Sequence, residues 1–287
     1  MRAGRLLSTS AGTHLGAFTA LDWALFSSIG LIWGSSFLLI AVGLEAFDPG
    51  VVTWLRILFG AGVLWLVPSV RTPVDGSDRP RLVALSLLWV GIPFTLFPLA
   101  EQHISSGTTG LLNGALPIFA VTIGSIMLGR FPGRVQLMGL AVGFAGVAAI
   151  ALPGVAQGSS EAVGIAMALL ATVCYGFAIN IAAPLTQRYG SLPVMARMLA
   201  LAAVWTAPFG LVGIGPSTVA WRSLLAVAAL GVVGTGIAFV LGVVVRGEQA
   251  HVSSIVGIAL VIAGALLASR REAARRRETA GAMAPRA

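Results

Sequence analysis

The chain has 287 residues, of which 57% are hydrophobic and only 10% are charged. Its mean hydropathy is +0.95. A soluble domain carries about 25% charged residues, so this composition excludes a water-soluble globular protein. Many apolar runs approach or exceed the roughly 18 residues with which a helix crosses a bilayer. The sequence therefore predicts an all-α, polytopic bundle of transmembrane helices.

Nine apolar runs are long enough to span a membrane, at about 22–44, 50–68, 82–100, 104–128, 134–152, 162–184, 192–214, 222–245 and 252–269. Residues 1–21 lack an apolar core, so we expect no cleaved signal peptide and a first run that remains as an anchor. These residues are expected to form a cytoplasmic tail, and 270–287 a basic C-terminal tail.

Arginines alternate between the loops in the way that the positive-inside rule predicts. With a cytoplasmic N-terminus, the basic loop residues that fall inside are Arg71, Arg79, Arg81, Arg130, Arg134 and Arg188. The acidic residues Glu45, Asp48, Glu101 and Glu161 fall outside. Nine crossings, however, place the basic tail 270–287 outside, whereas ten would bring it into the cytoplasm.

The net charge of +8 lies mostly at the chain ends and in short loops. It therefore orients helices, and we expect no nucleic-acid partner. The single Cys174 lies in an apolar run, and the three histidines are scattered along the chain, so we expect no metal site. No phosphate-binding loop is present. We expect neither a cofactor nor catalytic residues, and the protein is not expected to be an enzyme.

The sequence contains an internal repeat, and the second copy is shorter than the first. Corresponding pairs are Trp33 and Tyr175, Gly34 and Gly176, Arg56 and Arg197, Gly91 and Gly234, and Gly129 and Gly247. The first four pairs are offset by 141 to 143 residues and the last by 118, so about 25 residues, or one helix, are missing. The run 222–245 is then a fusion that crosses once, and a re-entrant hairpin at its glycines is the less favoured alternative.

The segments Ile32–Phe37, Asp48–Pro49 and Leu55–Phe59 resemble the opening of an EamA domain of the drug/metabolite transporter superfamily. Ser105–Phe119 is similar to the fourth helix of that family, and Gly139–Gly146 to its fifth. The resemblance implies ten helices in two inverted five-helix repeats, with a substrate cavity between them. This chain departs from the pattern, with five helices in its first repeat and four in its second.

We assign the first repeat to 22–152 and the second to 162–269. The resemblance implies a multi-pass carrier in a bacterial plasma membrane that exports small metabolites, amino acids or drug-like compounds by gradient-driven alternating access. Its partners would be a small-molecule substrate and the lipid bilayer, with a homodimer also considered. The alternative is a non-transporting or remnant membrane protein, because the missing helix corresponds to the one that carries Asn113 and Pro117.

Two arginines in apolar runs are the sharpest candidates for substrate contacts, Arg56 and Arg197. A guanidinium inside a membrane costs about 2.5–3.5 kcal/mol on insertion scales, so it should face the bundle interior. The arginines either cap neighbouring carbonyls as a packing device or attract an anionic group such as a substrate carboxylate.

Four further residues complete the candidate substrate-binding set: the aromatic pair Trp33 and Tyr175 and the amides Asn113 and Asn180. The aromatic rings either line a cavity or pack between helices, and the amides bond either to neighbouring helices or to substrate. Proton coupling by Glu101 with His103 is a further hypothesis, but a solvated loop pair is the preferred interpretation.

Overall fold

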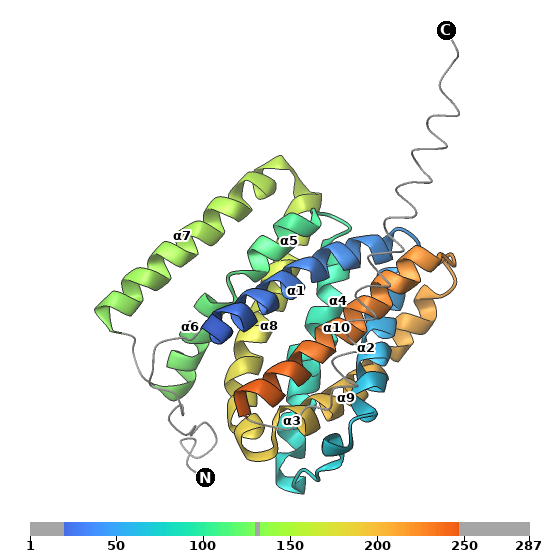
Figure 1. The fold of residues 1–287 in the computed structure, drawn as a ribbon. Coiled ribbons are helices and arrows are strands. Elements are labelled where there is room, and N and C mark those ends of the chain that lie inside the picture. Colours follow the sequence, from blue (N-terminus) through green and yellow to red (C-terminus); the bar gives the residue numbers. More distant parts are fainter. Residues whose placement is uncertain (1–19, 130–132, 247–287) are drawn as a thin grey trace.

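The computed structural model describes residues 20–129 and 133–246. Within these ranges every regular element is helical (Figure 1). The elements are α1 (Ala20–Leu44), α2 (Pro49–Trp65), η2 (Pro68–Arg71), η3 (Gly76–Asp78), α3 (Arg79–Leu85), η4 (Ser86–Gly91), α4 (Ile92–Ala100), α5 (Ser106–Asn113), α6 (Leu116–Leu128), α7 (Arg134–Gln157), α8 (Ser159–Tyr189), α9 (Ser191–Gly213) and α10 (Trp221–Arg246).

The first eight expected spans are present in the described residues, which confirms the all-helical fold predicted from composition. By length and composition, five helical stretches there are able to cross a membrane. The expected ninth span, 252–269, and both tails lie outside the described residues. Helix α10 runs without a break through its glycines, so the hairpin alternative was wrong.

Prolines shape the third span, which consists of α3, η4 and α4. Pro93 has no N–H, and the preceding Ile92 N–H bonds to the Leu87 carbonyl five residues back, in π-helical geometry. Pro98 likewise cannot donate to the carbonyl of Phe94. The hydroxyl of Thr53 on α2 lies 2.8 Å from that carbonyl and also 2.8 Å from the Pro49 carbonyl of its own helix, so it can donate to either. The carbonyl that Pro98 leaves free in the third span thus forms a contact with α2.

The fourth span is interrupted between α5 and α6. Ser105 caps the start of α5 by accepting a hydrogen bond from the Thr108 N–H. The helix ends at Asn113 and resumes at Leu116. Pro117 cannot donate to the Asn113 carbonyl, so the normal i→i−4 bond is lost at this point. Interrupted spans that free backbone groups inside a bundle are typical of transporter binding sites.

The helices pack in the pattern that two related repeats would produce. Helix α1 packs on α10, and its counterpart α8 packs on α4, while α2 and its counterpart α9 pack on each other. Figure 1 shows α1 and α10 side by side, with α7 at one edge of the bundle. Each repeat therefore contributes helices to the packing of the other.

The counterparts α1 and α8 differ in one neighbour. Gly176 of α8 lies against α6, because a Cβ added there would come within 2.8 Å of Ile123 and 3.1 Å of Phe119. Its counterpart Gly34 on α1 has nothing within 4 Å. Leu38, which corresponds to Asn180, is 60% exposed. Among the described residues, nothing covers the place on α1 that corresponds to the contact of α8 with α6.

Candidate functional site

Arg56 lies about two turns after Pro49 on α2, and it is partly buried against α4. The guanidinium carbon lies 3.6 Å from the centre of the Phe94 ring, a cation–π contact. Among the described residues, no hydrogen bond or ion pair engages its N–H groups. Arg56 is therefore a cation in the bundle interior whose donors remain available to a ligand.

Aromatic rings from three helices pack on one another, on the same helix face of α4 as the Phe94 ring that contacts this arginine. Phe37 of α1 and Phe97 of α4 meet edge to face with centroids 5.3 Å apart. Tyr175 of α8 packs on Phe97 with centroids 5.8 Å apart, and it interacts electrostatically with Arg56. We call the group formed by Phe37, Arg56, Phe94, Phe97, Glu101 and Tyr175 the central cluster.

Glu101 belongs to this cluster and is not the solvated residue that the sequence suggested. It caps the end of α4, in the connection between the spans Gly76–Ala100 and Ser106–Leu128. Both carboxylate oxygens are buried and have no hydrogen-bond partner. Burial raises the pKa of Glu101 to about 8, against an opposing attraction by Arg56. His103, its expected companion, instead shares a hydrogen bond of 2.9 Å with Ser160.

Asn113 lies close to the cluster along α5. It follows by one turn Gly110, where an added Cβ would come within 3.1 Å of the Phe37 ring. The side-chain oxygen Oδ1 of Asn113 is buried without a hydrogen-bond partner. A buried acceptor left unpaired is costly, so this oxygen is a candidate for a ligand donor.

The structure brings three of the six predicted residues, Arg56, Asn113 and Tyr175, to the cluster or beside it. Trp33 is counterpart to Tyr175 but is 45% exposed, on the part of α1 that lacks a neighbour. The two remaining residues have protein partners. Arg197 donates to the carbonyls of Val70 and Pro193, each at 3.0 Å.

Asn180 also has partners that account for its amide. Its Nδ2 donates to the Ala120 carbonyl of α6 at 2.9 Å and to the Gly176 carbonyl of α8 at 2.8 Å. Both N–H groups are therefore used, one in joining α8 to α6 and the other within α8. Of the two interpretations that the sequence left open for Arg197 and Asn180, the contacts favour packing.

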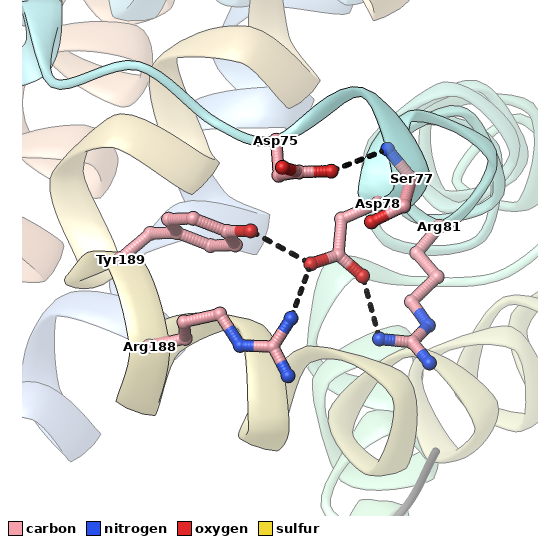
Figure 2. A network of polar contacts seen from close by, with 6 residues as sticks. All are labelled: Asp75, Ser77, Asp78, Arg81, Arg188 and Tyr189. Atoms are coloured by element: carbon pink, nitrogen blue, oxygen red, sulfur yellow. Dashed lines mark hydrogen bonds and ion pairs between the residues drawn. The ribbon is translucent and has the colours of Figure 1, made fainter. Parts of the chain in front are cut away.

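A second polar group escaped the sequence analysis altogether (Figure 2). Asp78 is only 3% exposed, and its carboxylate accepts from Arg81 at 2.6 Å, Arg188 at 2.8 Å and the Tyr189 hydroxyl at 2.8 Å. Asp75 beside it accepts from the Ser77 N–H. The network joins the start of α3 to the end of α8, and hence the first repeat to the second.

The sequence held a signal for this network. Asp78 is an acid in a loop whose arginines lead the positive-inside rule to place it in the cytoplasm. An acid among such residues is unusual enough to suggest an ion pair. Sequence alone, however, does not identify Arg188 and Tyr189 as its partners, because they lie about 110 residues further along the chain.

Apolar helices able to cross a bilayer, broken by prolines around a charged and aromatic cluster, define a polytopic membrane protein built like a transporter. Residues 23–152 match the model of the EamA-like transporter family. Together with relatives that are named as transporters, this match indicates a membrane transporter and shows that the chain is similar to the EamA-like family. The resemblance predicted from the sequence is confirmed.

Three comparisons illustrate the relationship. A "probable terminal-alkyne amino-acid exporter" of Streptantibioticus cattleyicolor is 29% identical, over 89% of this chain and 95% of its own. The uncharacterized inner membrane transporter YedA of Escherichia coli K12 is 26% identical, over 61% of this chain and 57% of its own. One crystal structure, 21% identical, covers 87% of this chain and 98% of its own with a TM-score of 0.51, which supports the fold alone.

Proposed function

We propose that the protein is a carrier of a bacterial plasma membrane that exports small metabolites, among them amino acids, by gradient-driven alternating access. The observation that carries this proposal is Arg56. Its guanidinium is stacked on Phe94 inside the bundle and has no acceptor among the described residues. Such a charge is costly in a membrane unless it serves a ligand, so it is suited to bind a substrate carboxylate.

The relatives support the same class of cargo. One of them is named as an amino-acid exporter and another as an inner membrane transporter. The rings of Phe37, Phe97 and Tyr175 add an apolar surface near Arg56. An anionic group on Arg56 with an apolar side chain on these rings matches an amino acid of low polarity better than a sugar or an inorganic ion.

Alternating access requires contacts between the repeats that can break. With the orientation expected from the arginines, the Asp78 network lies on the cytoplasmic side and links α3 to α8. Arg197 forms a second link there, from α9 to the carbonyl of Val70 in η2. We propose that these contacts close the cytoplasmic end of the carrier and separate when it opens inward.

The test is uptake of radiolabelled L-leucine into everted membrane vesicles that contain the full chain. Arg56→Ala should reduce uptake at least tenfold while the protein still inserts at normal levels. The matched control is Arg222→Ala, because Arg222 pairs with Glu45 in an exposed position. Uptake by Arg56→Ala at the unmutated rate would show that Arg56 is structural.

The second candidate function is a non-transporting membrane protein, and the open face at Gly34 favours it. A reporter fused after residue 287, together with the vesicle assay, separates the two. An outside tail with no transport supports the remnant, whereas export with the tail on either side supports the carrier. A homodimer would use the same open face, and disulfide cross-linking of Ser35→Cys in membranes tests for it, with the buried Cys174 replaced by serine.

A further inference from the structure

Glu101 is the feature of the central cluster that a purely anionic substrate does not explain. Its carboxylate has two buried oxygens and no hydrogen-bond partner. A structural carboxylate at the end of a helix would reach solvent or accept hydrogen bonds from neighbouring N–H groups. Glu101 does neither. Its electrostatic interaction is with Arg56, whose donors have no acceptor in the part of the chain that the structure describes.

An arginine and a carboxyl group that interact without pairing are complementary to a ligand that carries both charges in the reverse order. Arg56 and Glu101 reach the cluster from α2 and from the end of α4, and no ion pair joins them. On α4, the residues Phe94, Phe97 and Glu101 follow one another at spacings of three and four, so they share one face of the helix. Arg56 packs on the Phe94 ring, so the arginine, the aromatic rings and the carboxyl group adjoin one face of α4.

We propose that Glu101 is the cation-binding pole of the substrate site, which receives the ammonium group of a zwitterionic amino acid whose carboxylate is bound by Arg56. This inference rests on the proposed function and specifies the substrate class for the same site. Phe37, Phe97 and Tyr175 then cover the apolar side chain. The unpaired Oδ1 of Asn113 is placed to accept a further N–H from the ligand.

The same arrangement couples the substrate to a proton. Because burial raises the pKa of Glu101 to about 8, the empty site holds a protonated carboxyl at neutral pH. When the ammonium binds, the carboxyl O–H bond breaks and its proton leaves to water on the side to which the site is open. No covalent bond forms with the substrate. Each cycle therefore exchanges one substrate for one proton at the same carboxylate.

The groups around Glu101 leave it as the titrating residue of the site. Arg56 on α2 is a permanent cation, and Tyr175 on α8 acts on Arg56 and not on Glu101. Glu161 of α8 is directed at Gly154 of α7, since its Oε2 lies 3.1 Å from a Cβ added there. His103 is engaged with Ser160.

The test is equilibrium binding to the purified full chain, with three probes that share one carbon skeleton. L-Leucine carries both charges, N-acetyl-L-leucine lacks the ammonium and 3-methylbutylamine lacks the carboxylate. The unmutated protein should bind leucine at least tenfold more tightly than either analogue. Glu101→Gln should weaken leucine at least tenfold and make it equal to N-acetyl-L-leucine, whereas Glu45→Gln, an exposed glutamate, should change nothing.

Binding of leucine to the unmutated protein should strengthen about tenfold per pH unit from pH 6 to pH 8, and Glu101→Gln should abolish this dependence. His103→Gln should preserve it. If Glu101→Gln does not fold, Glu101→Asp decides, because it should keep the preference for leucine over N-acetyl-L-leucine. Unchanged leucine binding by Glu101→Gln overturns the inference and leaves the carrier intact. A protein that neither binds nor transports any of the probes overturns both.

Discussion

Asp78 offers the clearest quantitative prediction for stability, because its carboxylate is 4% exposed and accepts three hydrogen bonds. Removing one partner of a buried ion pair typically costs about 3–5 kcal/mol. The partners here are partly open, since the side chain of Arg81 is 21% exposed and that of Arg188 57%. Both can turn to water once the carboxylate is gone, so we expect Asp78→Ala to cost about 3 kcal/mol, near the lower limit.

The matched control is Glu45→Ala. The pair formed by Glu45 and Arg222 has the same N–O distance of 2.8 Å as that of Asp78 and Arg188, but its side chains are 50% and 38% exposed. An exposed pair is worth about 0.2–1 kcal/mol. Burial of the carboxylate is thus the variable that separates the two substitutions. Asp78→Asn, which keeps the shape and loses the charge, should fall between them.

The assay is unfolding of the purified protein in mixed micelles with increasing SDS, followed by tryptophan fluorescence. Asp78→Ala should lower the free energy of unfolding by about 3 kcal/mol, and Glu45→Ala by less than about 1 kcal/mol. If the two variants unfold at the same SDS fraction, burial does not set the strength of the Asp78 network, and the two repeats are not held together there.

Two further predictions use the same unfolding assay. Thr53→Val should lower the free energy of unfolding by about 1–3 kcal/mol, because the Phe94 carbonyl loses the hydroxyl that replaces the missing proline N–H. Thr53→Ser keeps the hydroxyl and should be nearly neutral. Equal losses in the two variants would refute the role of that hydrogen bond. Gly176→Leu should be strongly destabilising, because the new side chain would collide with Phe119. Gly34→Leu should be tolerated. Equal effects of the two substitutions would mean that a neighbour covers Gly34.

The fold could be predicted from the sequence because its causes are local. A helix that must cross a bilayer needs an apolar run of sufficient length. The first eight runs are helical, and five stretches among the described residues are long and apolar enough to cross. The internal structure of the spans was harder to foresee. Pro93 predicts a weakened turn, but it does not predict whether the helix kinks there or adopts π-helical geometry. That choice depends on neighbouring helices such as α9, whose Trp205 donates to Ser86.

The candidate site was only partly predictable, because a residue type does not reveal its partners. Arg56 and Arg197 occupy corresponding positions in the two copies, yet Arg197 donates to two carbonyls and Arg56 lies on an aromatic ring. The difference comes from what faces each arginine across the bundle. Glu101 was misjudged for the same reason: its position at a helix end suggested solvent, and α8 packs closely over that turn at Gly164.

The sequence predicts that the second repeat lacks one helix, and the position of the central cluster bears on whether transport survives such a loss. The cluster draws its residues from α1, α2, α4 and α8, and all of these are present. The open face around Gly34 and Leu38 belongs to α1, where both residues lie within one turn of Phe37 but on another side of the helix, since Phe37 is buried and Leu38 is 60% exposed. Leu38 replaces the bonded Asn180 of the other copy, so this face needs no polar partner and tolerates lipid. If the second repeat is short, as we predict, one flank of α1 can face lipid while Arg56 and Glu101 stay inside the described bundle.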